Sequence, residues 1–293
     1  MKRARALAIV NPAAGKGVGA RVAPRIAAEL GAVGLSVDVV TTPGPGEAAR
    51  LASHAVEEGY ERVIAVGGDG TANEVANGLV DSQTALALYP IGSGNDFSRV
   101  LGYPRERKRL ASFIAQARPR RIDVGEVNGR VFLNAAGVGI DGYVAERIIA
   151  TARVVGPTLG YFVGALVGVA TYRPRPMRVS IDGQTRVGDH LVVVAANGTH
   201  FGSGMHVAPL AQLDDGVLDV IVGGDLGRWA SLVALGKIYR GTHVDGKTIL
   251  HFRSPTLDVA LDSPQPMEMD GEASRTTSLR VRIRPRALTV LAG

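Results

Sequence analysis

The chain has 293 residues, of which 46% are hydrophobic and 20% are charged, so its composition is that of a globular protein and excludes wholesale disorder. Cysteine is absent, which excludes disulfides, thiolate metal sites, iron–sulfur clusters and a cysteine nucleophile. The net charge of +6 is too small to indicate a nucleic-acid-binding protein, although it suits an anionic substrate or an anionic membrane surface. The length predicts two domains or one large one.

The first 120 residues alternate between strand-like and helix-like patterns. Apolar runs of strand length lie at Leu7–Val10, Val37–Val40, Val63–Val66 and Ala85–Leu88. Between them, apolar residues recur every four positions, as in Val22, Ile26 and Leu30, which is typical of a helix with one buried face. Strands that alternate with helices predict a parallel sheet covered on both faces, a doubly wound α/β domain.

After about residue 122, short strand-like patterns dominate. They occur at Val131–Leu133, Val179–Ile181, Leu191–Val194, Leu218–Val222, Leu257–Leu261 and Ser278–Leu291. Asp182-Gly183 is a hairpin signal, and helices are expected near Tyr143–Ala152 and Trp229–Tyr239. We therefore predict an α/β domain over 1–122, joined by a C-terminal strand at 287–293, and a mainly antiparallel β-sandwich or open barrel over 123–286.

An uncharged stretch lies between Arg153 and Arg173 and is just long enough to span a bilayer. It contains Pro157 and glycines and has polar-patterned sequence on both sides, so a buried or surface-docking helix is favoured over a membrane span. The apolar run Ala6–Val10 is too short for a secretory signal and is interpreted as a first strand. We expect a cytoplasmic protein, peripheral to a membrane, that could touch lipid without crossing it.

The motif Gly67-Gly68-Asp69-Gly70-Thr71-Ala72-Asn73-Glu74-Val75 follows one predicted strand and opens a helix. Glycines leave backbone N–H groups bare, and the following helix presents its positive end, which favours phosphate. Asp69 would repel phosphate unless a divalent cation lay between them, so the motif indicates a magnesium–nucleotide site. The alternative is a tight turn in which Thr71 caps the helix.

Two further glycine-rich loops follow predicted strands at the same edge of the sheet. One is Pro90–Phe97, with Ser93 and Asp96, and the other is Asn11–Gly17, where Lys16 could meet phosphate charge. Neither has the spacing of a P-loop, and each alone could be only a turn. Three such loops at one edge favour a nucleotide cleft.

Several later patterns are less specific. Gly137–Gly142 fits G-x-G-x-x-G but lacks the acidic residue expected about 20 positions later, so a loop lining an interdomain cleft is favoured over a dinucleotide site. Asp270-Gly271-Glu272 could be a solvated hairpin or could hold a general base, and Asp214–Gly216 could be a turn or an oxygen-ligand cation site. The basic clusters Arg105–Arg109, Arg118–Arg121 and Arg173–Arg178 are interpreted as solvated surface, with a lipid headgroup site as the alternative.

These motifs together resemble the soluble bacterial diacylglycerol kinase family, which includes lipid kinases related to sphingosine and ceramide kinases. The resemblance rests on GGDGTANEV, NPAAGKG and PIGSGNDF, and on the later NAAGVGIDG, DDGVLDVIV and MDGE segments. GGDGT alone is shared with NAD kinases. The resemblance implies a nucleotide domain, a β-sandwich domain, an active site between them, and transfer of the γ-phosphoryl group of ATP to a lipid hydroxyl with Mg²⁺.

The resemblance also implies roles for individual residues. Nucleotide-surrounding residues would be Asn11, Thr42, Gly68, Asp69, Gly70, Thr71, Ala72, Asn73, Glu74 and Ser93. Asp69, Asp96 and Asp123 would hold a water–magnesium network, and Asp215 with the backbone carbonyls of Gln212 and Val217 would hold a structural magnesium. Glu272 would accept the proton of the lipid hydroxyl, with Asp270 beside it. Ser93 stands where threonine is common, and Ala72 is smaller than the usual Leu or Ile.

Two other functions stay open at this point. An NAD kinase would phosphorylate a water-soluble dinucleotide, and a non-catalytic protein would bind lipid or nucleotide without turnover. The presence of both Asp69 and Glu272 disfavours an inactive site. The sequence leaves a homodimer open, and the expected contacts of the uncharged stretch Val154–Tyr172 are with acyl chains.

Overall fold

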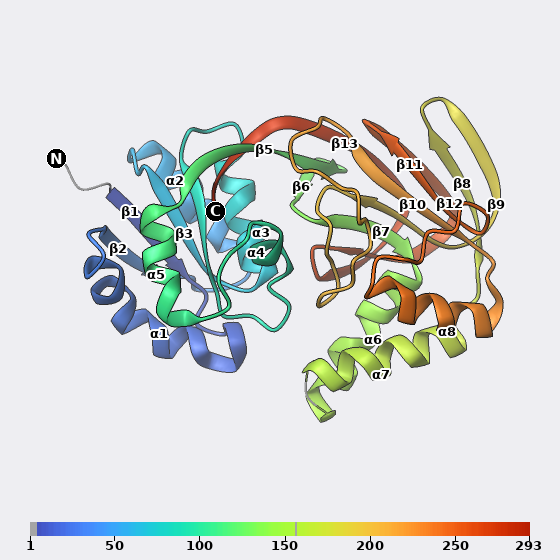
Figure 1. Cartoon of the computed structure of the whole chain (residues 1–293), viewed down its shortest axis with the longest axis horizontal. Coiled ribbons are helices and arrows are strands. Elements are labelled where there is room, and N and C mark those ends of the chain that lie inside the picture. Colours follow the sequence, from blue (N-terminus) through green and yellow to red (C-terminus); the bar gives the residue numbers. More distant parts are fainter. Residues whose placement is uncertain (1–4, 156) are drawn as a thin grey trace. The chain divides into compact units, whose positions relative to one another are not determined.

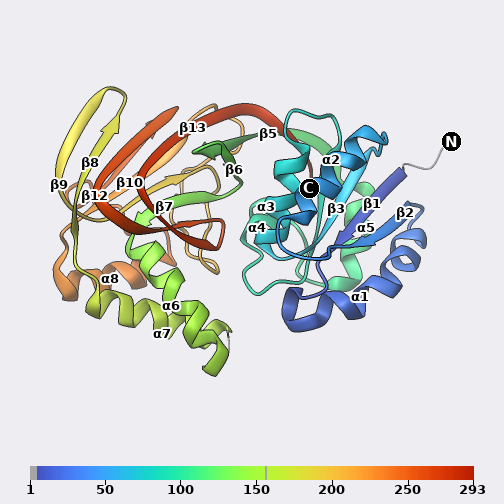
Figure 2. The same cartoon turned by 180° about the vertical axis from the view of Figure 1, so that it is seen from behind.

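The computed structural model describes residues 5–155 and 157–293, with side chains for all of these except 148–155, 157–162 and 165. The chain divides into two compact units. Unit 1 comprises Met1–Asp123 and Arg286–Gly293, and unit 2 comprises Val124–Pro285. Figures 1 and 2 show the elements of each unit from opposite sides.

Unit 1 is built on parallel strands with helices between them. In chain order it contains β1 (Arg5–Val10), α1 (Ala14–Gly31), β2 (Ser36–Thr41), α2 (Glu47–Glu57), β3 (Arg62–Gly67), α3 (Asp69–Leu79), β4 (Ala85–Pro90), α4 (Asp96–Val100), α5 (Arg107–Gln116), the start of β5 (Arg118–Val127) and the end of β13 (Glu272–Ala292). Strand β1 pairs in parallel with β2 and β3, and β3 pairs in parallel with β4. The end of β13 joins the sheet beside β4, where Val290 pairs with Leu86.

Helices lie on both faces of this sheet. Helix α1 packs near α5, whereas α2 packs against α3 on the other face (Figures 1 and 2). The residues that repeat every four positions in α1, Val22, Ile26 and Leu30, are all buried. Burying both faces of the sheet leaves its edge at the carboxyl ends of the strands as the place where loops gather.

Unit 2 is mainly antiparallel. It contains the rest of β5, then β6 (Arg130–Phe132), β7 (Ala135–Gly139), α6 (Ile140–Val155), α7 (Pro157–Thr171), β8 (Arg175–Ile181), β9 (Gln184–Ala196), β10 (Leu218–Gly224), α8 (Gly227–Ile238), β11 (Ile249–Ser254), β12 (Thr256–Met269) and the first part of β13. The strands follow the order β11-β10-β9-β7-β12-β13, while β8 pairs with both β9 and β12. Strand β9 is long enough to pair with β8 through its first half and with β7 and β10 through its second.

The core of unit 2 follows from alternation along its strands. In β13, Leu279, Val281 and Ile283 are buried, whereas the arginines between them point outward. The β8–β9 hairpin turns at Asp182 and Gly183, whose φ angles are 49° and 75°, as a two-residue turn requires. Among the described residues, no helix combines the length and the apolar character needed to cross a bilayer.

One segment differs from the expectation. The structure makes Ala135–Gly139 the central strand β7, and α6 begins directly after it at Ile140, so Gly137–Gly142 is a strand–helix junction and not a loop. The small residues of this segment allow β7 to fit between β9 and β12, with which it pairs in antiparallel fashion. This strand direction also excludes the parallel βαβ unit that a dinucleotide site needs.

Candidate active site

In unit 1, the loops that follow β1, β3 and β4 contact one another. The Asn11 side-chain amide donates to the Thr71 hydroxyl at 3.1 Å. The N–H of Ile91 donates to the carbonyl oxygen of Gly67 at 2.9 Å. The three predicted loops therefore form one connected surface at the carboxyl ends of the strands, where α/β folds bind ligands.

Glycine is required where two of these loops approach. A Cβ atom at Gly92 would lie 2.6 Å from the Cα atom of Gly68, which is closer than real Cβ atoms come to a neighbouring backbone. A Cβ atom at Gly15 would lie 2.3 Å from the carbonyl oxygen of Ile91. The loops thus meet backbone to backbone, and the surface they form is made largely of peptide groups.

Helix α3 directs the N–H groups of its first turn, which have no partner within the helix, toward this surface. Its first internal hydrogen bond runs from the N–H of Ala72 to the carbonyl oxygen of Gly68 at 3.0 Å. The N–H groups of Asp69, Gly70 and Thr71 precede that bond and lie at the positive end of the helix. This arrangement attracts an anion such as a phosphate.

Asp69 is the acidic group of this surface. Its Oδ1 accepts the N–H of Phe97 at 3.1 Å. Burial raises the pKa of the Asp69 carboxyl, and the N–H groups of Phe97, Asp96 and Asn95 offset that effect in part. A carboxylate whose charge is disfavoured by burial is a suitable ligand for a divalent cation, because the cation restores the charged form.

The other predicted nucleotide residues fall into two groups. Thr42 follows β2 and is tied to the same edge by its N–H, which donates to the carbonyl oxygen of Val10 at 2.9 Å. Lys16, which has a non-helical φ of 58° near the start of α1, and Ser93, which lies in the loop after β4, are both exposed. Lys16 and Ser93 are placed where a nucleotide could reach them, whereas the Thr42 side chain is buried.

Three residues of α3 point elsewhere. Ala72 and Asn73 are buried in unit 1. The Glu74 carboxylate accepts the N–H of Ala48 at 3.2 Å, which satisfies a donor in the first turn of α2. These contacts are structural, and Thr71 is itself buried, so the part of the motif open to a ligand is 68–70.

The predicted magnesium ligands of unit 1 do not form a ready cage. The Asp96 carboxylate pairs with Arg99 at 3.2 Å, and Oδ1 of Asp123 accepts the N–H of Arg286 at 2.7 Å. Among the described residues, no three His, Asp or Glu side chains converge closely enough to hold a metal by themselves. A magnesium ion that keeps several waters needs only one or two carboxylates, so Asp69 still fits one.

The predicted structural magnesium site in unit 2 fits less well. Oδ1 of Asp215 accepts the N–H of Val217 at 3.2 Å, and its Oδ2 forms an ion pair with Arg253. Gln212 is exposed in the same turn. Arg253 therefore already supplies positive charge at the place where a cation was expected, and we derive nothing from a cation there.

The acidic hairpin between β12 and β13 holds the two remaining predicted residues. Asp270, with φ 46°, is buried, and its carboxylate accepts the N–H groups of Leu133, Asn134 and Ala135 at 2.6, 2.9 and 3.2 Å. These bonds attach the hairpin turn to the start of β7. Asp270 thus has both oxygens engaged in holding the turn.

Glu272 stands differently on the same hairpin. Its side chain is 41% exposed, and Oε2 pairs with the guanidinium of Arg130 at 2.7 Å. A carboxylate that is accessible and oriented by one arginine can accept a proton from a bound hydroxyl. Sequence reasoning did not identify Arg130, because nothing in the local pattern ties it to a turn more than a hundred residues later.

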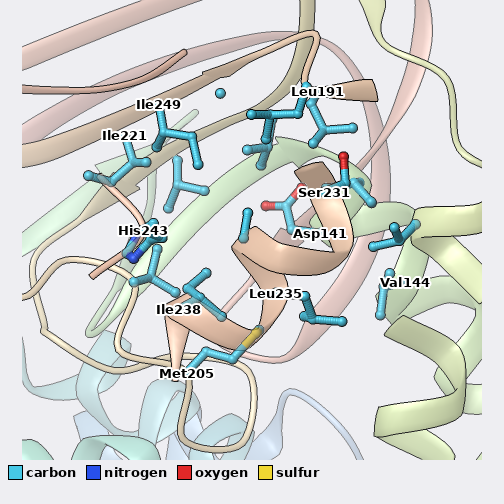
Figure 3. Close-up of a pocket in the computed structure, with 18 of the residues that line it drawn as sticks. Asp141, Val144, Leu191, Met205, Ile221, Ser231, Leu235, Ile238, His243 and Ile249 are labelled. Carbon is cyan, nitrogen blue, oxygen red and sulfur yellow. The ribbon is translucent and has the colours of Figure 1, made fainter. Parts of the chain in front are cut away.

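Unit 2 also contains an apolar pocket of about 140 Å³ (Figure 3). Its walls come from α6, α7, α8 and strands β9 and β10, and its polar side chains belong to Asp141, Ser231 and His243. A pocket with a mainly apolar lining and a few polar groups favours a mostly apolar ligand. The predicted acyl-contact segment reaches the pocket through Val169, while side chains 154–162 and 165 lie outside the described residues.

Asp141 is the acidic group on the pocket wall. Its Oδ1 accepts the N–H of Gly142 at 2.8 Å, whereas its Oδ2 is enclosed and has no partner in the described part of the chain. Burial raises the pKa of Asp141 to about 7. Sequence reasoning missed this residue because it treated the surrounding glycines as a loop, although an acid directly before the predicted helix Tyr143–Ala152 was the available signal.

Comparison with known families assigns both parts of the chain. Residues 5–127 match the model described as the diacylglycerol kinase catalytic domain. Residues 134–292 match the model described as the YegS C-terminal NAD kinase beta sandwich-like domain. Together, the matches leave only short segments of the chain unassigned.

Individual proteins show the same similarity over nearly the whole chain. A diacylglycerol kinase of Bacillus subtilis is 28% identical over 277 residues, covering 93% of this chain and 90% of that protein. A Pseudomonas aeruginosa protein described as a YegS-like lipid kinase is 32% identical over 261 residues, covering 88% and 85%. A crystal structure of a Bacillus anthracis protein assigned as a diacylglycerol kinase is 27% identical, has a TM-score of 0.82, and is matched over 100% of this chain and 99% of that one.

Proposed function

The chain belongs to the diacylglycerol kinase family of lipid kinases, and from this premise we propose that it transfers the γ-phosphoryl group of ATP to the hydroxyl of a diacylglycerol-like lipid. The observation that carries the substrate class is the apolar pocket of unit 2. A water-soluble dinucleotide, the substrate of an NAD kinase, has no use for such a pocket. An acyl chain gains free energy by entering it, because apolar surface leaves water.

Unit 1 supplies the nucleotide side of the reaction. The N–H groups at the start of α3 would bind the phosphates, and Lys16 would add positive charge. Asp69 would hold Mg²⁺, with Asp96 and Asp123 reaching it through water. When bound, Mg²⁺ supplies neutralisation of the charge on the phosphoryl oxygens, which is the main requirement of phosphoryl transfer.

Unit 2 supplies the acceptor side. Glu272 would take the proton of the lipid hydroxyl, while Arg130 orients its carboxylate. Asp270 is assigned the positioning role, because its bonds to 133–135 fix the hairpin that carries Glu272. The reaction requires the Glu272 hairpin and the Asp69 loop to meet at one substrate, and we place the active site in a cleft between the units.

The test of this function uses the whole chain. Purified protein is incubated with labelled ATP, Mg²⁺ and either dioleoylglycerol in mixed micelles or NAD, and the labelled product is identified. We expect label in a phosphatidic acid and none in the dinucleotide. Label in NADP would overturn the proposed acceptor, and the absence of label from both acceptors and from a mixed lipid extract would overturn the proposed activity.

A further inference from the structure

Helix α8 (Gly227–Ile238) is apolar on two opposite faces. Its inner face lines the pocket with Ala234, Leu235 and Ile238. Its outer face carries Trp229 and Val233, which are 84% and 58% exposed and lie four residues apart on one side of the helix, together with Leu232, which is 36% exposed. An apolar helix face is normally covered by protein or lipid, and within the described part of the chain no protein covers the outer face of α8.

The neighbouring helix adds to the apolar exposure. Helix α7 packs beside α8, as both views of the molecule show (Figures 1 and 2), and exposes Leu166 and Val167 by 36% and 42%. Single exposed apolar residues are common on soluble proteins, but several on adjoining helices indicate an interaction surface. The exposed apolar surface therefore extends over both α7 and α8.

The charges around α8 determine what kind of partner fits. Residues 226–244 contain Arg228, Lys237 and Arg240 and no Asp or Glu. All three cations are exposed, and helical spacing puts Arg228 and Lys237 at the two borders of the outer face. Long basic side chains at such borders can reach phosphates while their stems and the helix between them lie in an apolar layer.

The carboxylates that flank this segment are engaged locally. Oδ1 of Asp225 accepts the N–H of Gly227 at 3.0 Å, and Oδ1 of Asp245 accepts the N–H groups of Lys247, Thr248 and Ile249 at 2.9, 2.8 and 2.8 Å. Both carboxylates keep their negative charge, but they lie outside residues 226–244, so the charged side chains of the helix and its extension are all basic. A surface that is apolar, aromatic and cationic matches an anionic bilayer.

We propose that the outer face of α8 docks on the surface of an anionic phospholipid bilayer, with Trp229 at the level of the headgroups and Arg228, Lys237 and Arg240 on lipid phosphates. Tryptophan prefers this depth because its ring is apolar and its N–H is polar. The inference rests on the proposed function in one respect, since a lipid kinase must reach a substrate held in a membrane. Docking would bring the pocket on the inner face of the same helix next to that membrane.

The chain provides its own probe, because Trp229 is its single tryptophan. The intact protein is titrated with vesicles of equal parts phosphatidylglycerol and phosphatidylcholine, and with vesicles of phosphatidylcholine alone. We expect a blue shift of tryptophan emission and quenching by brominated acyl chains, stronger on the anionic vesicles. Unchanged emission on both vesicle types would overturn the proposal, as would a blue shift without vesicles that grows with protein concentration alongside a dimer mass in light scattering, because a second copy would then cover this face.

Matched variants locate the surface. Val233→Glu should weaken vesicle binding in sedimentation roughly tenfold or more, because the exposed valine that would enter the lipid layer is replaced by a charge. Val187→Glu makes the same change at a residue of β9 that is 67% exposed, and it should bind vesicles as the wild type does. Lys237→Gln should weaken binding about fivefold on anionic vesicles and leave binding to phosphatidylcholine unchanged. Equal effects of Val233→Glu and Val187→Glu would overturn the assignment to α8.

Vesicle binding needs neither ATP nor turnover, so its failure is separable from failure of the kinase. The second assay measures phosphorylation of a short-chain diacylglycerol dissolved below its micellar concentration, where no surface is needed. Val233→Glu should keep wild-type turnover there and lose turnover on vesicle-borne substrate. If Val233→Glu lost turnover equally in both assays while binding vesicles normally, the docking proposal would be overturned and the kinase activity would stand.

Discussion

Two glycine-rich segments of this protein join a strand to a helix, yet their glycines serve different ends. In unit 1, Gly67–Thr71 follows a parallel strand, and the helix donors after it stay available at the sheet edge. In unit 2, Gly137–Gly142 spans the end of β7, which has two antiparallel neighbours, and the start of α6, and a Cβ atom at Gly137 would lie 2.0 Å from Oδ2 of Asp141. Glycine spacing alone therefore does not define a phosphate site. The direction of the strand and the packing around it determine whether the glycines expose backbone donors or allow close packing.

The acids of the two segments differ in the same way. Asp69 and Asp141 both lie in the first turn of a helix, and burial raises the pKa of each. Asp69 is surrounded by backbone donors and suits a cation, whereas Asp141 faces an apolar pocket. A carboxyl in such a pocket is well placed to hydrogen-bond a polar group of a mostly apolar ligand.

The largest effect is expected at Asp69. Asp69→Asn removes the charge that would hold Mg²⁺ and should lower kcat by about 10³-fold, a size typical for the loss of one group that stabilises transition-state charge. Steady-state kinetics with dioleoylglycerol measures it, and thermal unfolding checks that the fold is kept. Asp262→Asn, an exposed acid of β12, is the matched control and should change neither quantity. Wild-type turnover in the Asp69 variant would remove this residue from the mechanism.

The next comparison separates the two acids of the β12–β13 hairpin. Glu272→Gln should lower kcat by about 10²–10³-fold through loss of the proton acceptor, with little change in stability. Asp270→Asn weakens bonds to three backbone donors and should lower the free energy of unfolding by about 1–3 kcal/mol. Denaturant unfolding and kinetics on both variants test this division. Full stability in the Asp270 variant combined with greater loss of turnover than in the Glu272 variant would reverse the two roles.

A third prediction concerns pH. The Asp141 carboxyl ionises near 3.8 in the unfolded chain and near 7 in the folded protein, so the folded state binds more protons between these values, and the free energy of unfolding falls as pH rises through that window. Asp141→Asn should therefore be more stable than wild type at pH 8 by up to about 4 kcal/mol, with the difference vanishing near pH 4. Urea unfolding across pH measures it. A constant difference between the two proteins would show that Asp141 is not held in an apolar site.

The smallest effect is expected from packing alone. Gly137→Ala should lower the free energy of unfolding by about 1–3 kcal/mol, because the new methyl group meets the Asp141 carboxyl. Gly188→Ala, where an added Cβ has open space, is the control and should be near neutral. Nucleotide affinity should be unaffected by either change, as measured by calorimetry with ATP and Mg²⁺. A loss of nucleotide affinity in Gly137→Ala would revive a phosphate role for this segment.

The sequence could predict the elements that have a regular apolar pattern of their own. It could not predict those that form only because other segments pack against them. Short apolar runs located β1 to β4, and the four-residue repeat located α1, in which Ile26 and Leu30 are buried, but neither pattern identified α4, α5 or β5. The apolar pattern predicted β9 and β12 to be shorter than they are. Their polar halves show no alternation of apolar and polar residues and are strands only because neighbouring strands pair with them. The apolar pattern missed β7 for a related reason, since small residues in a central strand give no apolar period.

The site was predictable to the extent that its residues are neighbours in sequence. The motif 67–75 placed Asp69 and the helix donors in advance, and the structure links them to Asn11 and Ile91. Arg130 and the pocket around Asp141 depend on contacts between distant segments, so no local pattern could supply them. The separate roles proposed for Asp270 and Glu272 likewise depend on contacts with distant residues, because they follow from the partners that each carboxylate already has.

The long strand β13 affects how this protein is made by the ribosome. Its last part belongs to unit 1, where Leu288, Val290 and Leu291 are buried and Val290 pairs with Leu86 of β4. Residues 286–293 are translated after all of unit 2. Unit 1 is therefore the first unit to be synthesised and the last to complete its fold. During translation, the nascent unit 1 would therefore have an exposed sheet edge beside β4 until this strand emerges, a period in which chaperones or aggregation could act on it.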